Sequence, residues 1–187
     1  MTVTTLDAKT ALIVVDLQKG IVSYPIAQPI DMVVKHASEL TDAFRRHNLP
    51  VVLVNVKGGA PGRAEQVRSA GERPSDWADL IPELNRQPED HVVTKHTWGA
   101  FTNTDLHEHL KRLGVTQVVV IGVATSIGVE STARHAHELG FNVTLAIDAM
   151  ADMSDVNHDH SVTRIFPRLG ETGTTQEIID LLDRRGH

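Results

Sequence analysis

The sequence contains no cysteine among its 187 residues. Disulfide bonds, thiolate metal ligands and catalysis by a cysteine nucleophile are therefore excluded, because each of them requires a thiol. No apolar run approaches the roughly 20 residues that a membrane-spanning helix needs. Residues 1–10 are polar and lack the basic and apolar regions of a secretion signal, so we expect a cytoplasmic protein that does not contact membranes.

Positively charged residues are fewer than negatively charged ones, 18 against 24, so the net charge is −6 with histidine neutral. A negative balance without a basic run disfavours binding to nucleic acid or anionic membranes, so the expected partner is a small-molecule substrate. Hydrophobic residues make up 41% and charged residues 22%, which is ordinary for a globular protein. The length predicts a single domain over residues 1–187.

Short runs rich in β-branched residues alternate with stretches of helical pattern. Strands are predicted at residues 11–15, 51–56, 91–95, 117–122 and 142–148. Helices are predicted near residues 31–47, 105–113, 127–139, 155–166 and 176–184. This alternation indicates right-handed crossovers and a largely parallel sheet that is covered on both faces.

Polar residues follow several of these strands, at the edge where parallel α/β sheets bind ligands. Asp16 ends the first strand, Lys95 the third and Asp148 the fifth, while residues 123–126 follow the fourth. A buried aspartate near a lysine is a candidate acid/base pair, although a structural salt bridge has the same composition. The long connection over residues 58–76 is typical of a lid or binding loop.

Four segments, in order along nearly the whole chain, resemble the isochorismatase-like (cysteine hydrolase) superfamily. They are DLQ at 16–18, KHTWGAFTNTDL at 95–106, GVATSIGVESTAR at 122–134 and FPRLG at 166–170. The resemblance implies a three-layer α/β/α fold with a mainly parallel, six-stranded, Rossmann-like sheet. It also implies a homodimer or a larger homo-oligomer.

In that superfamily an aspartate, a lysine and a cysteine form the catalytic set. The resemblance assigns the first two to Asp16 and Lys95, and it places Gly128 where the cysteine would stand. Glycine at this position resembles the isochorismatases, which cleave a vinyl ether without a covalent intermediate. Metal-binding members carry Asp-x-His after the second strand, whereas residues 57–62 read KGGAPG here, so neither a metal nor another cofactor is expected.

Gly128 falls near the start of a predicted helix, where the lack of a side chain leaves room for a ligand or a water molecule. N–H groups of a first helical turn favour an anionic group there; the alternative is simply a small residue at a helix start. The resemblance also implies a cis peptide between Val123 and Ala124 that directs backbone N–H groups, as an oxyanion-type site, into a pocket that Thr125 helps to form.

Asp16 is the main candidate for proton transfer, either as an acid toward a vinyl ether carbon or as a base toward water. Burial would raise its pKa and Lys95 would lower it. Lys95 either positions the charge of the substrate or stabilises Asp16. Gln18 either orients Asp16 or caps a helix. Trp98 and Phe101 follow Lys95 in a loop and either form a wall of the pocket or pack on the core.

Other polar side chains could have a functional role, but their positions in the sequence do not favour one. Ser126 is expected to cap a helix rather than to act as a substitute nucleophile. Glu130 is expected at the surface or an interface, with a pocket role as the alternative. The pairs His107/His109 and His158/His160 point to different faces of a helix, so we expect exposed residues rather than a metal site.

Three functions are consistent with these features. The first is hydrolysis of a vinyl ether such as isochorismate or a related small acid. The second is hydrolysis of an amide or ester by water that Asp16 activates. The third is a non-catalytic ligand-binding or scaffold protein. The joint presence of Asp16 and Lys95 favours an enzyme, because a binding protein has no need of both.

Overall fold

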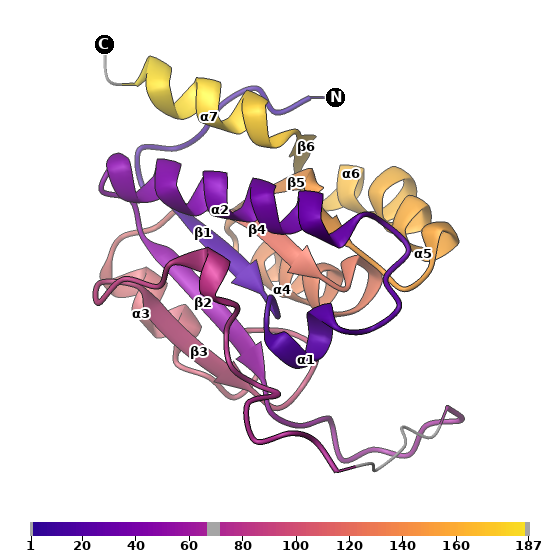
Figure 1. Ribbon diagram of the computed structural model, residues 1–187. Helices are drawn as coiled ribbons and strands as arrows, with labels where there is room; N and C mark the ends of the chain where they lie inside the picture. The colour runs from indigo at the N-terminus through magenta and orange to yellow at the C-terminus, as the bar shows by residue number, and fades with distance from the viewer. Residues whose placement is uncertain (1, 67–71, 186–187) are drawn as a thin grey trace.

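A six-stranded, all-parallel sheet with helices on both faces forms the centre of the molecule (Figure 1). The computed structural model describes residues 2–66 and 72–185, and the strand order is β3-β2-β1-β4-β5-β6. The strands are β1 (Thr10–Val15), β2 (Val51–Val56), β3 (His91–Lys95), β4 (Gln117–Val123), β5 (Asn142–Ala151) and β6 (Glu171–Gly173). This arrangement confirms the three-layer α/β/α fold. The sixth strand has only three residues, too few to stand out as an apolar run.

The helices divide between the two faces of the sheet. They are α1 (Lys19–Val22), α2 (Ile30–Arg46), α3 (Leu106–Arg112), α4 (Glu130–Glu138), α5 (Asp155–His160), α6 (Phe166–Leu169) and α7 (Thr175–Arg184), with a short 3-10 turn at Pro82–Leu84. Helices α2 and α7 cover one face, and α3, α4 and α6 cover the other (Figure 1). Their apolar side chains belong to the two hydrophobic cores on these faces. Helix α7 begins at a capping box, in which Thr174 and Glu177 bond reciprocally.

Strand β1 explains why the sheet is covered on both sides. All six of its residues are buried, and successive side chains of a strand point to opposite faces. Leu12 and Val14 belong to the core beneath α2 and α7, whereas Ile13 and Val15 belong to the core beneath α3 and α4. A continuous apolar run is therefore what this central position requires.

Two of the predicted helices contain π-helical turns that the sequence pattern does not reveal. Residues Thr125–Val129 form such a turn directly before α4, and Ser161–Ile165 form another between α5 and α6. The helix predicted near residues 155–166 is therefore three short pieces that continue to Leu169. Single π-turns often occur at functional sites, and the first of these follows the end of β4.

Strand β5 is longer than predicted, because it contains an irregularity. Its pairing with β4 shifts between Val120 and Gly122, and the strand continues to Ala151 rather than ending at Asp148. Within the described residues no helix has both the length and the apolar character needed to cross a membrane.

Candidate active site

Asp16 is the first residue after β1, and it is buried, with 5% of its surface exposed. Its φ of 53° lies in the left-handed region that few residues other than glycine adopt. Its backbone N–H donates to the carbonyl of Val54 at 2.9 Å, so the turn stays attached to β2. The turn thereby holds the carboxylate at the carboxyl edge of the sheet. Unusual backbone conformations of this kind cluster at active sites.

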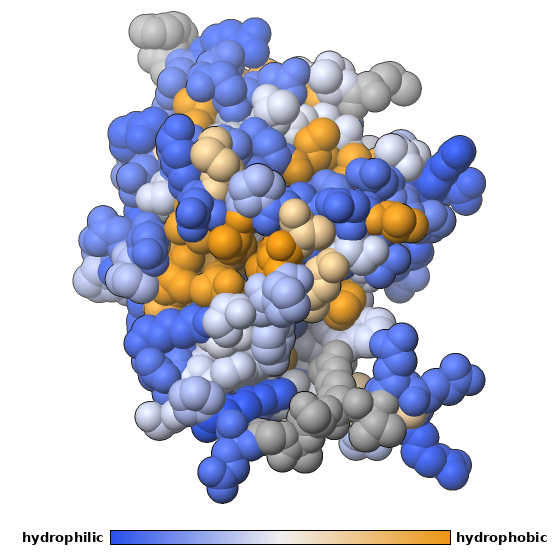
Figure 2. Space-filling view, turned by 45° about the vertical axis from the view of Figure 1, so that its right-hand side comes forward, coloured by the Kyte–Doolittle hydropathy of each residue, from blue (hydrophilic) through white to orange (hydrophobic). Residues whose placement is uncertain are grey.

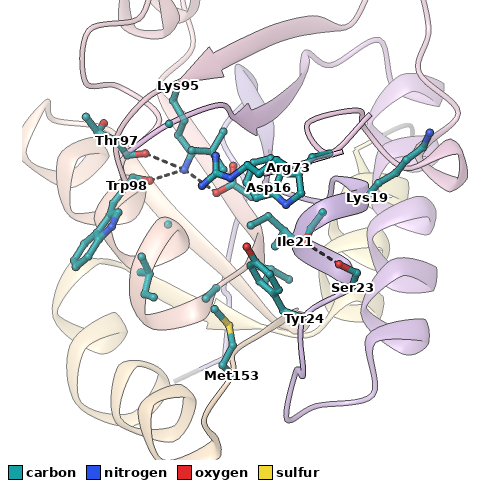
Figure 3. A pocket seen from close by; sticks show the side chains of 18 of the residues that line it. Asp16, Lys19, Ile21, Ser23, Tyr24, Arg73, Lys95, Thr97, Trp98 and Met153 are labelled. Carbon is teal, nitrogen blue, oxygen red and sulfur yellow. Dashed lines mark hydrogen bonds and ion pairs between the residues drawn. The ribbon is translucent and has the colours of Figure 1, made fainter. Parts of the chain in front are cut away.

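Lys95 is the last residue of β3 and reaches across the end of β2 toward Asp16 (Figure 3). It is 1% exposed, although lysine is rarely buried unless paired. Its Nζ donates to Oδ2 of Asp16 at 2.7 Å and to the carbonyls of Thr97 at 3.2 Å and Trp98 at 2.9 Å. Three acceptors match the three protons of an ammonium group, so the side chain is fixed in one direction.

The carboxyl group of Asp16 has a raised pKa. Burial raises its pKa to about 6, because desolvation outweighs the opposing charge and hydrogen bond of Lys95. Oδ2 accepts from Lys95, whereas the buried Oδ1 has no hydrogen-bond partner among the residues that the structure describes. Buried oxygens in folded proteins are normally paired, so Oδ1 is suited to a ligand or a water molecule.

The end of β4 lies beside Asp16 because the two backbones approach closely. Gly122 has a φ of 118°, and a Cβ placed there would collide with the carbonyl oxygen of Val15, so only glycine fits. The following peptide, between Val123 and Ala124, is cis, as the resemblance implies. Both of these residues line the cavity next to Asp16.

Gly128 lies within the π-turn that follows β4, and it is buried. A Cβ added there would lie 3.3 Å from Oδ2 of Asp16, 3.0 Å from Cγ1 of Val15 and 3.5 Å from the carbonyl oxygen of Trp98. A side chain at this position would therefore contact the carboxylate directly. Its absence leaves space in front of Asp16.

A cavity of about 1260 Å³ opens over this pair (Figure 3). Among its lining residues are six predicted site residues, namely Asp16, Lys95, Trp98, Val123, Ala124 and Gly128. Helix α1 and the connection at residues 58–76 supply much of the rest, consistent with the predicted binding loop. The part of that loop at residues 67–71 lies outside the described residues.

The structure places three predicted site residues outside this cavity. Gln18 is fully buried, and its amide bridges the backbone of Val56 and the carbonyl of Trp77. It is the N-cap residue of α1, but its side chain bonds neither to that helix nor to Asp16. Phe101 packs in the core beside His135 and Phe141. The local sequence does not determine the direction in which either side chain points.

Thr125 is the third of these residues. It is fully buried, and its Oγ1 lies 2.8 Å from Nδ1 of His158. The hydroxyl of Ser126 donates to Asp152 at 2.7 Å, and Ser126 lies inside the π-turn, whose N-cap residue is Ala124, so the predicted capping role of Ser126 is wrong. These contacts attach the π-turn to the segment that follows β5.

Asp148 is also not among the residues that line the cavity. Its carboxylate accepts from the N–H of Thr175 at 2.8 Å and from the hydroxyl of Thr175 at 3.0 Å, at the start of α7. The irregularity in β5 moves the strand end to a later residue, and Asp152 takes the position beyond it. The sequence pattern does not reveal this insertion, because Asp148 interrupts the apolar run and marks a strand end that the structure places three residues later.

Glu130 and the histidine pairs lie away from the Asp16–Lys95 pair. Glu130 accepts from Ser161 at 2.6 Å and Arg134 at 2.9 Å. His109 stacks on His91 with ring centroids 3.7 Å apart. In residues 2–66 and 72–185, no three histidine, aspartate or glutamate side chains come together in a group that could hold a metal ion.

Several cavity residues were not predicted from the sequence. Ile21 and Tyr24 come from α1 and its end, Arg73 and Trp77 from the long loop, and Met153 from the segment after β5. The chain has only two tryptophans, and both line the cavity. A tryptophan inside a polar loop is the one signal that could have identified Trp77.

Comparison with known proteins agrees with the fold. Residues 10–177 match the isochorismatase domain family. The chain is 45% identical to the uncharacterised isochorismatase family protein YwoC of Bacillus subtilis, covering 92% of this chain and 93% of that protein. A solved isochorismatase family protein from Burkholderia thailandensis is 40% identical with a TM-score of 0.92, covering 96% and 98% of the two chains.

Two further relatives have names that state an activity. Nicotinamidase 3 of Arabidopsis thaliana is 31% identical, over 83% of this chain and 79% of that protein. The N-carbamoylsarcosine amidase of Thermoplasma acidophilum is 30% identical with a TM-score of 0.76, over 89% and 96% of the two chains. Both names describe hydrolases of carbon–nitrogen bonds.

Proposed function

Because this chain belongs to the isochorismatase family, whose members include hydrolases, we propose that it is a hydrolase of that family that works without a cysteine nucleophile. We assign the nucleophile position of the family to Gly128. The observation that carries the proposal is the Asp16–Lys95 pair at the base of a cavity, with Oδ1 of Asp16 unpaired among the described residues and no side chain at position 128.

The proposed substrate is a small carboxylate-bearing vinyl ether such as isochorismate. Protonated Asp16 delivers its proton to the terminal vinyl carbon, which forms a C–H bond and leaves an oxocarbenium-like ion. Water adds to the carbon that bears the ether oxygen, and the carboxylate of Asp16 recovers a proton. Collapse of the resulting hemiketal breaks the C–O bond and releases an alcohol and a ketone. No covalent enzyme intermediate is required.

Lys95 serves two purposes in this scheme. It keeps the Asp16 carboxylate oriented through the 2.7 Å contact, and it stabilises the charge that appears on Asp16 when the proton leaves. Val123, Ala124 and Gly128 line the cavity beside this pair, whereas the N–H of Ser126 in the π-turn already donates to Asp152 at 2.8 Å.

A second candidate reaction is favoured by one observation. A pKa of about 6 leaves Asp16 largely ionised at neutral pH in the free protein, which suits a general base. In this reaction Asp16 removes a proton from water as the oxygen attacks an amide or ester carbonyl, and returns it to the leaving group. A bound substrate carboxylate would raise the pKa of Asp16 and favour the acid role instead.

The test is pyruvate release from isochorismate by the purified protein and by its Asp16→Asn variant. Asparagine suits the positive φ of this position, which Asn48, Asn85 and Asn103 also adopt. Asp42→Asn, on the exposed face of α2, is the matched control. We expect release by the wild type and the control, and loss in Asp16→Asn with unchanged circular dichroism. Equal release by all three proteins would refute the role of Asp16.

No release from isochorismate by any of them would move the search to amides and esters, with the same variants. If the wild type turns over none of these compounds, a non-catalytic ligand-binding protein becomes the leading interpretation. Turnover of an amide or ester that Asp16→Asn abolishes would establish the second reaction.

We also propose that the chain assembles into a homodimer or a larger oligomer. Apolar side chains gather on one face of the molecule (Figure 2). Large exposed apolar residues include Met32, Met153 and Val156, and the last of these is 77% exposed. Contiguous apolar surface commonly marks an interaction site. Light scattering after size-exclusion chromatography measures the mass, and a monomer at micromolar concentration would refute this proposal.

A further inference from the structure

The π-turn at Thr125–Val129 forms part of the cavity wall, and two polar contacts hold its start. Oγ1 of Thr125 lies 2.8 Å from Nδ1 of His158 in α5. The next residue, Ser126, donates its backbone N–H to Oδ2 of Asp152 at 2.8 Å and its hydroxyl to the same oxygen at 2.7 Å. Both partners come from the segment that follows β5, so this segment fixes where the turn begins.

Asp152 is itself held on several sides. It is the first residue after β5, and it is 2% exposed. Its Oδ1 accepts from the N–H of Ser154 at 3.2 Å. Its backbone N–H donates to Oε1 of Gln28 at 2.7 Å, and its carbonyl accepts from the N–H of Ala27 at 2.8 Å. Because its side chain and its backbone are both anchored, Asp152 is a rigid support for Ser126.

A carboxylate suits this support better than a neutral side chain does. Hydrogen bonds to a charged acceptor are shorter than neutral ones and roughly twice as strong. Both oxygens of Asp152 accept, one from Ser126 and the other from Ser154, whereas an asparagine side chain has only one acceptor oxygen. An amide at position 152 would therefore turn an N–H group toward one of these donors, and the contact with the π-turn would weaken.

The segment after β5 serves the cavity more than it serves the hydrophobic core. None of the six residues of α5 is buried, and Val156 is 77% exposed. The contact of His158 with Thr125 instead joins this helix to the π-turn. Met153, which directly follows Asp152, lines the cavity (Figure 3). The same short segment thus supplies one wall of the cavity and holds another.

A small movement of the π-turn would change the site, because its backbone already lies close to Asp16. Gly128 is two residues beyond Ser126, and a Cβ there would lie 3.3 Å from Oδ2 of Asp16. Ala124, two residues before Ser126, lines the same cavity. A displacement of about 1 Å within an active site can reduce the rate about 100-fold. The position of Ser126 therefore bears directly on the chemistry.

We infer that Asp152 is a positioning residue of the active site, which acts through Ser126 to hold the π-turn against Asp16. Asp152 is not among the residues that line the cavity, so it acts without touching the substrate. The inference rests on the proposed function in taking this cavity as the site of hydrolysis.

Asp152→Asn tests the inference, with Asp148→Asn as the matched control. Asp148 accepts from the N–H of Thr175 at 2.8 Å and from its hydroxyl at 3.0 Å, so the two carboxylates make the same kind of contact. The control contact lies at the start of α7, and neither of its residues lines the cavity. Both variants are assayed at a temperature at which circular dichroism shows them folded. A merely structural role would give both variants the same result.

We expect Asp152→Asn to reduce kcat by about tenfold or more with a smaller change in KM, and Asp148→Asn to leave both nearly unchanged. Water that enters beside a displaced turn would weaken the desolvation of Asp16. The inflection of kcat/KM should therefore move to lower pH in Asp152→Asn and stay in place in the control. If the two variants agree in kcat and in the inflection, the inference is overturned.

Variants of Ser126 separate the position of the turn from the charge of Asp152. Ser126→Ala loses the hydroxyl contact but retains the backbone N–H and the charge of Asp152. We expect it to lower kcat and the inflection in the same direction as Asp152→Asn, by a smaller amount. Ser126→Thr restores a hydroxyl and should resemble the wild type. An inflection that moves in Asp152→Asn but in neither variant of Ser126 would contradict an action through Ser126.

A second measurement does not depend on turnover. Labelling with 15N-glycine limits the NMR spectrum to the 13 glycines, and the signal of Gly128 is the one that Gly128→Ala removes. We expect this signal to shift in Asp152→Asn and to stay in place in Asp148→Asn. A shifted signal in a protein without hydrolytic activity would support the inferred position of the turn and count against the proposed reaction alone. An unshifted signal in a protein that releases pyruvate would overturn the inference alone.

Discussion

Nζ of Lys95 lies 2.7 Å from Oδ2 of Asp16, although the two residues are 79 positions apart in the chain. The contact joins the edge strand β3 to the central strand β1 across the end of β2. Both groups are buried, so solvent screens their interaction little, and a change in the charge of one alters the pKa of the other. The pair therefore offers a direct way to test the chemistry of the site.

The pH dependence of kcat/KM separates the two proposed roles of Asp16. The free protein holds this group at a pKa of about 6. If Asp16 is the acid, the protonated form reacts, so kcat/KM is constant well below this pH and falls tenfold per pH unit above it. If Asp16 is the base, kcat/KM falls below this pH instead. We expect the first profile with a vinyl ether substrate, and an increase through this range would contradict the acid role.

Lys95→Met should move the same profile to higher pH. The charge and the hydrogen bond of Lys95 both lower the pKa of Asp16, so their removal leaves desolvation unopposed. Methionine is unbranched and fills a similar path. The inflection in kcat/KM should therefore rise above 6, while Lys95→Arg, which retains a positive charge, should shift it less. An unchanged inflection in Lys95→Met would show that the titrating group is not Asp16.

The stability of the protein should follow the titration of Asp16 with a defined sign. Its folded pKa, about 6, is above the ordinary value of 3.8. The folded state therefore binds the proton more tightly, so the stabilising contribution is complete below the ordinary value and is lost as pH rises toward the folded value. Chemical denaturation at several pH values measures the free energy of unfolding of the wild type and of Asp16→Asn. We expect the part of its pH dependence that comes from Asp16 to be absent in the variant. If the free energies of unfolding of the two proteins changed with pH in parallel, the raised pKa of Asp16 would be contradicted.

Gly128→Ala should reduce activity much more than stability. The added methyl group would lie 3.3 Å from Oδ2 of Asp16 and 3.0 Å from Cγ1 of Val15, in the space proposed for substrate or water. Alanine favours helical backbone by about 1 kcal/mol over glycine, which offsets part of the crowding. We expect a change in unfolding free energy within about 1 kcal/mol and a large loss of kcat/KM. Full activity would show that position 128 is remote from the reacting atoms.

Gly122→Ala should disrupt the fold itself. Its φ of 118° disfavours any side chain, and a Cβ would collide with the backbone of Val15. Strain and overpacking together should lower the free energy of unfolding by about 2–5 kcal/mol in denaturant titrations. Gly114→Ala is the control, because Gly114 has a φ of 68° and no atom near its Cβ, so its cost should be only about 1 kcal/mol. Equal losses in the free energy of unfolding for Gly122→Ala and Gly114→Ala would refute the close approach of β1 and β4.

The sheet was predictable because its signal is local. The run at residues 51–54, VVLV, is apolar and buried at every position, as is typical of strands covered on both faces. The three-residue strand Glu171–Gly173 and the π-turn Thr125–Val129 were missed, since neither has a distinctive pattern of its own. Their conformations depend on the neighbouring strand β5 and on Asp152 respectively.

The sequence by itself determined that no thiol takes part, that the sheet is parallel, and that Asp16 and Lys95 stand at the carboxyl ends of two of its strands. Parallel strands bring their carboxyl ends to one edge, so the meeting of these two residues followed from their positions. Only the tertiary structure decided that Gln18 and Phe101 point away from the cavity while Arg73 and Trp77 line it. Those directions depend on the path of a loop and on packing between distant segments, and a shift of one residue in an extended segment turns its side chains to the other face.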